Sequence, residues 1–281
     1  MEILSVENLS VTPKNAPSRF LVKGASFKLS AGKTTCIVGE SGSGKSLTAL
    51  TIMGLLSNQL AASGKVVFQG EDITQLDNKA LQKIRGAKIG MIFQEPMTSL
   101  NPVLTVGYQI GESLTAHFGL KGAALRANIH ELLQQVGIPV ERFGSYPDEL
   151  SGGQRQRVMI AMSIACEPAL LIADEPTTAL DVTVQAQILK LLDELKTRMN
   201  MAMLFITHDF GVVADIADDV IVMFRGEIVE TGTKKQVLTK PQHPYTKALL
   251  ACVPDAEGKK QLKPIDYAWL KEDKLKSEKA A

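Results

Sequence analysis

A short stretch near the N-terminus combines glycines, serines and one lysine in an order that could bind phosphate. It consists of Gly39, Glu40, Ser41, Gly42, Ser43, Gly44, Lys45 and Ser46. The order fits G-x-x-x-x-G-K-[ST], in which glycine lets backbone N–H groups turn inward and form a nest for an anion. Lys45 would supply positive charge to the β- and γ-phosphates, and Ser46 would supply a hydroxyl to Mg²⁺. The stretch therefore predicts a nucleoside triphosphate site.

Two adjacent carboxylates, Asp174 and Glu175, follow the apolar run 170–173. A buried strand that ends in two acids would place them at the edge of a sheet, beside the phosphate-binding loop. Asp174 would then hold Mg²⁺, directly or through water, and Glu175 would act as the general base for the attacking water.

A second glycine-containing stretch precedes a predicted helix. It consists of Ser151, Gly152, Gly153 and Gln154. Ser151 is typical of an N-cap, and the helix should run to about Cys166 and end before Pro168. Glycines at a helix N-terminus allow close approach to an anion. Since one nucleotide rarely needs both phosphate-binding features from one chain, we expect the second to serve a nucleotide held by a partner subunit.

The elements that must position these residues alternate between short apolar runs and helical patterns, which is typical of α/β proteins. We expect strands at 3–6, 26–29, 35–38, 66–68, 89–93, 170–173, 203–206 and 220–223. Apolar residues at helical spacing predict amphipathic helices over 125–136 and 184–195, and 47–56 predicts a helix after the lysine. Residues 95–155 carry no strong strand signal and predict an inserted helical subdomain.

Composition narrows the class of protein. The chain has 281 residues, of which 45% are hydrophobic, and its 31 basic and 30 acidic residues give a net charge of +1. It is therefore globular and lacks the basic excess of a nucleic-acid-binding protein. No apolar run is long enough for a membrane helix, and the N-terminus does not resemble a secretory signal. The widely spaced Cys36, Cys166 and Cys252 are expected to be buried thiols in a reduced, cytosolic protein.

The motifs GESGSGKS, LSGGQ, LLIADEP and TALD, followed by His208, stand in the order and at about the spacing of the ATP-binding cassette (ABC) family. From about residue 3 to 254 the chain resembles an ABC transporter ATPase subunit. The resemblance implies a P-loop NTPase fold, with a RecA-like α/β core, an antiparallel β subdomain and an inserted α-helical subdomain. It places the ATP-binding core at 1–94 and 156–240, the helical signature subdomain at 95–155 and a C-terminal extension at 241–281.

The resemblance also implies roles for residues that carry little signal alone. Gln94 matches the family's glutamine that contacts Mg²⁺ and the attacking water, and Asp181 matches the residue that bridges two subunits. His208 matches the switch histidine at the γ-phosphate. Phe20 matches the aromatic residue that stacks on adenine, where most members have tyrosine. Leu47 stands where many cassettes have threonine, so its N–H can reach the α-phosphate but a hydroxyl contact is lost.

Two further segments, EPMTSLNP (95–102) and HPYTKALL (243–250), resemble the ATPase subunits of dipeptide, oligopeptide and nickel importers. This implies ATP and Mg²⁺ as cofactors and a second ABC ATPase in a head-to-tail dimer. It also implies two membrane permease subunits, an indirectly attached substrate-binding protein, a place on the cytoplasmic face of the cell membrane and no nucleic acid. Only Cys252 lies beyond the core, so we expect no iron–sulfur cluster, and we assign no metal site to His117, His130 or His243.

Several alternatives stay open. The chain could belong to an exporter or lipoprotein-release system, to a non-transport ABC ATPase of DNA repair or the ribosome, or to a simple P-loop kinase or GTPase. The cargo could be a dipeptide, an oligopeptide, a glutathione-like peptide or nickel, and the dimer could pair identical or different ATPases. The Lys-rich segment 258–281 predicts a solvated extension.

Overall fold

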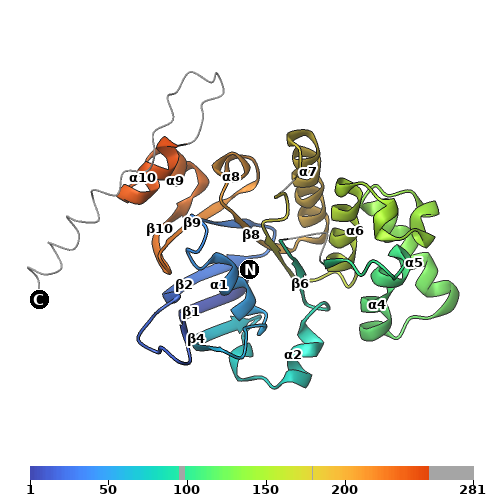
Figure 1. Cartoon of the computed structure of the whole chain (residues 1–281), viewed down its shortest axis with the longest axis horizontal. Helices are drawn as coiled ribbons and strands as arrows, with labels where there is room; N and C mark the ends of the chain where they lie inside the picture. Colours follow the sequence, from blue (N-terminus) through green and yellow to red (C-terminus); the bar gives the residue numbers. More distant parts are fainter. Residues whose placement is uncertain (95–98, 179, 253–281) are drawn as a thin grey trace, which may run out of the picture.

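The computed structural model describes residues 1–94, 99–178 and 180–252, which form two β-sheets with helices around them (Figure 1). A four-stranded antiparallel sheet has the order β2-β1-β4-β5, with β1 at Glu2–Pro13, β2 at Val22–Ser30, β4 at Leu60–Phe68 and β5 at Glu71–Asp72. A six-stranded sheet has the order β10-β9-β3-β8-β7-β6, with β3 at Thr34–Val38, β6 at Ile89–Ile92, β7 at Leu170–Asp174, β8 at Ala202–Thr207, β9 at Asp219–Phe224 and β10 at Glu227–Thr233.

Helices cover the six-stranded sheet and extend to one side of it. They are α1 (Lys45–Ile52), α2 (Asn78–Ile84), α4 (Val106–Phe118), α5 (Gly122–Gln135), α6 (Gly152–Ile164), α7 (Val182–Met199), α8 (Phe210–Ile216), α9 (Lys234–Thr239) and α10 (Pro244–Ala251). Short 3₁₀ turns lie at Ile73–Gln75, Val140–Gly144 and Pro147–Glu149. None of the described helices is both long and apolar enough to cross a membrane.

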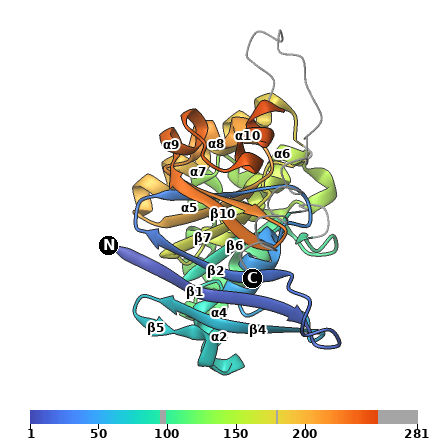
Figure 2. The same ribbon diagram turned by 90° about the vertical axis from the view of Figure 1, so that its left-hand side faces the viewer.

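The six-stranded sheet is buried on both faces, which explains why its central strands are continuous apolar runs. On β3, Cys36 and Val38 pack into the core shared with α4 to α8, whereas Ile37 packs into the core shared with α1 and the antiparallel sheet. Figure 2 shows the resulting layers, with α7 to α10 above the six-stranded sheet and the antiparallel sheet below it.

Parallel pairing brings the ends of three strands to one edge of the sheet. β3 lies between β8 and β9, and Val38 at the end of β3 pairs with Thr207 at the end of β8. Asp174 at the end of β7 pairs with Ile206 of β8. The segments that begin at residues 39, 175 and 208 therefore leave the sheet side by side, as expected for the binding edge of an open parallel sheet.

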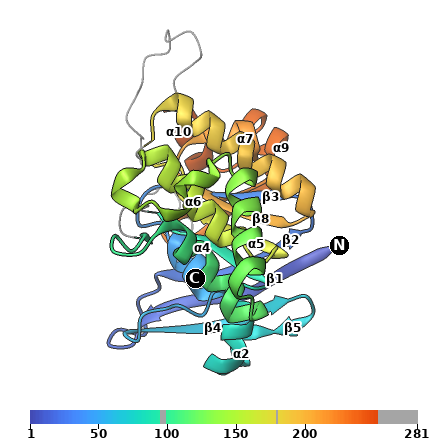
Figure 3. The ribbon, with the colours of Figure 1, turned by 90° about the vertical axis from the view of Figure 1, so that its right-hand side faces the viewer.

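The described part of 99–155 contains no strand and is built from α4, α5, two 3₁₀ turns and the first turn of α6 (Figure 3). α4 packs against both α5 and α6, and α6 packs against β6 and α7 as well. The limit expected between residues 155 and 156 falls inside α6, because one continuous helix joins the helical part to the sheet. Residues 95–98 and the Lys-rich segment 258–281 lie outside the described residues.

The strands expected from sequence are all present, but two strands and several strand ends were missed. β10 pairs only with β9 and keeps most of its side chains partly exposed, so Glu227–Thr233 lacks an apolar run. β1 and β4 extend to Pro13 and Leu60 through small and polar residues that pair with each other. The helix that includes Lys45 ends at Ile52 rather than at the expected residue 56. Gly54, two residues after this end, adopts a left-handed φ of +62° that does not continue the helix.

Candidate active site

The glycine loop leaves β3 and enters α1 through backbone conformations that require glycine. Gly42 and Gly44 have φ values of +79° and +101°, and Gly44 is the N-cap of α1. At Gly39, which has a φ of +154°, an added Cβ would collide with the backbone carbonyl of Met223 on β9. The loop is therefore held tightly against the sheet and leads directly into the N-terminus of α1, the end of a helix that can bind a phosphate.

Lys45 is buried, with 5% of its surface exposed, and folds back on the loop. Its Nζ donates hydrogen bonds to the carbonyl oxygens of Gly39 at 2.8 Å and Glu40 at 2.9 Å. Burial lowers the pKa of Lys45, and the neighbouring carboxylates of Glu175, Asp174 and Glu40 oppose that shift. A bound phosphate would replace the carbonyl contacts with a full negative charge and favour the ammonium form.

Ser46 and Asp174 form a hydrogen-bonded pair of oxygen groups next to the loop. The Ser46 Oγ donates to Asp174 Oδ1 at 3.0 Å, and Asp174 is 5% exposed. Burial raises the pKa of Asp174; the hydrogen bond from Ser46 opposes the shift, the charge of Glu175 adds to it, and Lys45 opposes it. A hydroxyl and a carboxylate are the hard oxygen ligands that Mg²⁺ uses together with water and substrate phosphates. The pair therefore fits Mg²⁺.

Three segments, which follow β6, β7 and β8, meet at the Glu175 side chain. Its Oε2 accepts hydrogen bonds from Gln94 Nε2 at 3.3 Å and from Thr178 Oγ1 at 3.0 Å, and it lies 3.2 Å from His208 Nδ1. Its backbone has a φ of +47°, and its N–H donates to the carbonyl oxygen of Ile206 on β8. The expected residues Gln94, Glu175 and His208 are thus brought together. Thr178, which the sequence reasoning missed, is the fourth member.

These groups open into a cavity of about 520 Å³. It is lined by Gly39, Glu40, Ser41, Gln94, Glu175, Thr178, His208, Phe210 and Leu249. A smaller hollow of about 220 Å³ lies between the loop residues 40–43 and the pair Phe224 and Arg225. Phe210 and Leu249 were not expected. Leu249 belongs to the segment HPYTKALL, which sequence reasoning used only as a family signal.

Phe20 precedes a residue that lies against the glycine loop, and Leu47 lies in the first turn of α1. Phe20 is 46% exposed and directly precedes Leu21, whose carbonyl oxygen would lie 3.0 Å from a Cβ on Gly44. An exposed aromatic face next to the N-terminus of α1 is compatible with stacking on a base. Leu47 is partly buried and packs on the core formed with the antiparallel sheet.

The second glycine stretch, residues 151–154, begins α6 and does not line the cavity that holds Glu175. Ser151 Oγ accepts from the Gln154 N–H at 3.3 Å, and Gln154 Oε1 accepts from the Ser151 N–H at 3.0 Å, which is a capping box. Ser151 and Gly152 are exposed, and a Cβ on Gly152 would meet nothing within 4 Å. Asp181 is also exposed and caps α7 through Val184. None of these residues lines the cavity beside Lys45.

A mainly parallel sheet that ends in a glycine loop, an Mg²⁺-type oxygen pair and a clustered glutamate defines a P-loop nucleotide-binding protein. The family model described as ABC transporter matches residues 22–178, and the chain belongs to this family. A second model, described as oligopeptide/dipeptide transporter, C-terminal region, matches residues 229–276. The resemblance read from the motifs is confirmed.

Relatives with related names match almost the whole chain. The chain is 56% identical to the peptidoglycan transport ATP-binding protein YejF of Agrobacterium fabrum over 91% of its length, but spans only 48% of that protein. It is 50% identical to the dipeptide transport ATP-binding protein DppD of Bacillus subtilis, covering 94% of this chain and 81% of DppD. It is also 50% identical to the glutathione import ATP-binding protein GsiA of Escherichia coli, covering 94% of this chain and 44% of GsiA.

Solved ABC cassettes share the fold. The ATP-binding cassette MJ0796, in a dimeric post-hydrolysis state bound to ADP and phosphate, has a TM-score of 0.74 and 29% identity, covering 83% of this chain and 99% of the cassette. The cassette cbiO1 of Clostridium perfringens, part of the transporter complex cbiONQ, has a TM-score of 0.75 and 30% identity, covering 85% and 91%. The expected α/β P-loop cassette fold is confirmed.

Proposed function

We propose that this chain is the ATP-binding and ATP-hydrolysing subunit of an ABC importer that takes up peptides, or nickel, across the cytoplasmic membrane. The observation that carries the proposal is the meeting of Gln94, Thr178 and His208 on the Glu175 carboxylate, beside the loop that holds Lys45. An ATP-binding site alone would not need a carboxylate aimed into the cavity by three side chains.

ATP would bind with its adenine on Phe20 and its phosphates in the loop from Gly39 to Leu47. The backbone N–H groups of the loop and of α1 would face the phosphates, and Lys45 would leave the loop carbonyls to contact the β- and γ-phosphates. Ser46, Asp174 and Gln94 would hold Mg²⁺, which would neutralise charge that develops on the phosphates.

Hydrolysis would start from the Glu175 carboxylate. Glu175 would take a proton from the attacking water, and His208, whose Nδ1 already lies 3.2 Å from Glu175 Oε2, would position the water and contact the γ-phosphate. Thr178 would keep the carboxylate in the cavity through its hydroxyl. Each of these residues stands at the end of a strand of the six-stranded sheet or shortly after it, so the sheet sets their spacing.

Two such subunits would pair head to tail. Ser151, Gly152, Gly153 and Gln154 of one subunit would contact the ATP held by the other, and Asp181 would bridge the two. The exposure of Ser151, Gly152 and Asp181 supports this arrangement, because a solvent-facing capped helix N-terminus is available to a partner's phosphate. None of the five residues lines the cavity that holds Glu175. The sequence motifs of both half-sites are intact, so either an identical or a related ATPase could pair with this chain.

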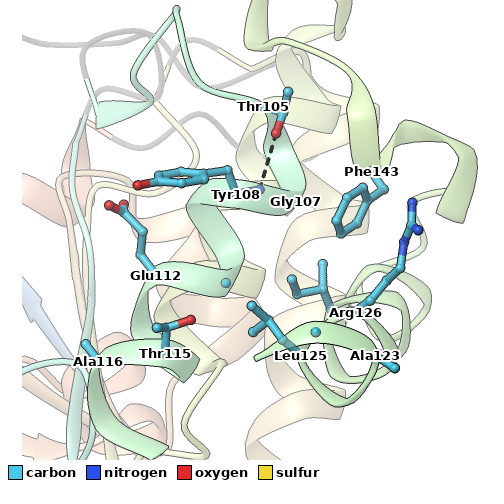
Figure 4. A pocket seen from close by; sticks show the side chains of 13 residues that line it. Thr105, Gly107, Tyr108, Glu112, Thr115, Ala116, Ala123, Leu125, Arg126 and Phe143 are labelled. Carbon is cyan, nitrogen blue, oxygen red and sulfur yellow. Dashed lines mark hydrogen bonds between the residues drawn. The ribbon is translucent and has the colours of Figure 1, made fainter. Parts of the chain in front are cut away.

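A membrane permease would dock on the helical part, for which we propose the limits 95–155, with 241–281 as a C-terminal extension. A cavity of about 1060 Å³ lies between α4 and α5 (Figure 4). Ile129 and Phe143 are among the residues that line it. Figure 4 shows Glu112 on one side of the cavity and Arg126 on the other. An apolar groove between opposite charges suits a short amphipathic helix of the permease. The subunit would then lie peripherally on the cytoplasmic face of the membrane.

The cargo would be selected by the permease and a substrate-binding protein rather than by this chain. The similarity to DppD, GsiA and YejF favours peptides over nickel. An ABC ATPase of an exporter or lipoprotein-release system, or a non-transport ABC ATPase, is the competing function. The match of residues 229–276 to the transporter C-terminal region favours the importer.

The test is affinity capture of a Glu175→Gln chain from native membranes with ATP and Mg²⁺, read by mass spectrometry. We expect two permease subunits, with or without a second ATPase.

A pair of variants tests the docking site in the same capture experiment. The exposed Ala123 lines the α4–α5 cavity and the exposed Ala124 does not. Ala123→Glu should therefore lose the permease while Ala124→Glu keeps it, with ATP binding intact in both. Recovery of ribosomal or DNA-repair proteins alone would overturn the importer proposal.

A further inference from the structure

Helix α10 reaches the glycine loop from a distant part of the chain. Tyr245, in its first turn, is fully buried, and its hydroxyl accepts a hydrogen bond from the Glu40 N–H at 3.0 Å. Leu249, one turn later, lines the cavity that holds Glu175 and His208. Figures 1 and 2 show α10 beside α9 and α8, on the helical side of the six-stranded sheet. The helix therefore forms part of the wall of the nucleotide site.

The contact falls on a peptide group that Lys45 also holds. The carbonyl oxygen of Gly39 and the N–H of Glu40 belong to one peptide unit. Lys45 Nζ donates to that carbonyl at 2.8 Å, and the Tyr245 hydroxyl accepts from that N–H. If Lys45 turns toward the phosphates, its hydrogen bond to the Gly39 carbonyl oxygen is broken, whereas the hydrogen bond between the Glu40 N–H and the Tyr245 hydroxyl can remain.

The Tyr245 side chain is itself fixed by neighbours from two strands. Its ring packs on Phe224 of β9, with centroids 4.2 Å apart. His243 Nδ1 accepts from the Tyr245 N–H at 3.1 Å, and Glu230 of β10 accepts from the N–H groups of Gln242 at 2.7 Å and His243 at 3.0 Å. These contacts fix the start of α10, so the hydroxyl has a defined position when it meets the loop.

We propose that Tyr245 is a positioning residue for the glycine loop, which keeps the peptide group between Gly39 and Glu40 in its binding orientation once Lys45 has moved to the phosphates. The inference rests on the proposed ATP-binding function. Without the hydroxyl the peptide group can turn, so the loop spends less of its time in the competent state, and the apparent affinity for ATP falls by that fraction.

The test is Tyr245→Phe, which removes one oxygen and keeps the ring on Phe224. Losing one hydrogen bond should weaken ATP binding and raise KM about fivefold, while kcat changes little. Hydrogen exchange of the Glu40 N–H in the nucleotide-free protein should be faster, with unchanged exchange in α5. Tyr146→Phe makes the same chemical change at a partly exposed tyrosine in the helical part and should alter neither quantity.

Phe224→Leu provides a second variant, because it keeps the hydroxyl but loosens its ring, and Glu40 exchange should again be faster. Wild-type ATP affinity and wild-type Glu40 exchange in Tyr245→Phe would overturn the positioning role. A fall in kcat at constant KM would also overturn it, since that would assign Tyr245 to the chemical step. If the wild-type chain and Tyr146→Phe both fail to bind ATP, the proposed function fails, while the exchange experiment still tests the contact.

Discussion

Replacing Glu175 with glutamine changes the chemistry of the site and little else. The glutamine has nearly the same shape, and its amide oxygen can still accept from Gln94 or Thr178, which now donate to Oε2 at 3.3 and 3.0 Å. An amide cannot accept a proton from water, so the general base is lost. The contacts of Lys45 with the glycine loop do not involve Glu175 directly and should persist.

The expected change in kcat follows from the separation of ATP binding by Lys45 and the glycine loop from catalysis by Glu175. General-base catalysis contributes about 10²–10⁴-fold, so kcat should fall by about that factor. ATP affinity should change far less, and the ATP-bound dimer should accumulate because hydrolysis no longer opens it. Phosphate release at saturating ATP and Mg²⁺ measures the first quantity, nucleotide titration the second and size-exclusion chromatography the third.

Glu194→Gln is a suitable control, because it removes an exposed carboxylate of α7 whose oxygen lies 3.8 Å from the Lys190 ammonium nitrogen. Surface pairs of this kind contribute little, so its turnover should match that of the wild type. A kcat of the Glu175→Gln variant within about tenfold of the wild-type value would refute the assignment of Glu175 as the general base. Loss of ATP binding in Glu175→Gln would refute the separation of binding from catalysis.

Three further substitutions test the same site. Lys45→Ala should weaken ATP affinity by tenfold or more, because hydrogen bonds to charged groups contribute about 1.5–3 kcal/mol; a titration that gives wild-type affinity would contradict the loop assignment. Asp174→Asn should raise the melting temperature of the nucleotide-free protein at neutral pH and abolish Mg²⁺-dependent turnover. Burial raises the pKa of Asp174 in the folded protein, so Asp174 stabilises the fold while it is protonated at low pH, and this stability is lost as the pH rises through the folded pKa. A melting temperature of Asp174→Asn below that of the wild type would contradict this reasoning. Thr178→Val should lower kcat several-fold with ATP affinity unchanged, since the Thr178 hydroxyl donates to the Glu175 carboxylate; an effect on affinity alone would show a different role.

The parts of the site predicted best from sequence are those set by local rules. The glycine loop needs positive φ at Gly42 and Gly44, and the strand before it and the helix after it follow from nearby apolar residues. The cap at Ser151 follows from the reciprocal pairing with Gln154, a pattern visible within four residues. The meeting of Gln94, Glu175 and His208 came only from the family resemblance, because parallel strands far apart in sequence bring them together.

Residues whose contacts depend on how a turn or a distant segment folds were not predicted. Thr178 is one of two adjacent threonines, and only the turn after β7 decides that its hydroxyl faces Glu175. Tyr245 stands 205 residues beyond Glu40, and no pattern along the chain could place its hydroxyl on that N–H. β10 has no apolar run because it is an edge strand, yet it carries Glu230, which fixes the start of α10.

The charges at the nucleotide site explain why Mg²⁺ and ATP should stabilise this fold as well as react in it. Burial lowers the pKa of Lys45 and raises that of Asp174, so each charged form is disfavoured in the nucleotide-free protein. A phosphate beside Lys45 and a divalent cation beside Asp174 would reverse both shifts together, since each brings the opposite charge. Nucleotide and metal should therefore bind cooperatively. The same coupling accounts for Asp174→Asn, which removes the cost of the buried carboxylate and with it the gain from the cation.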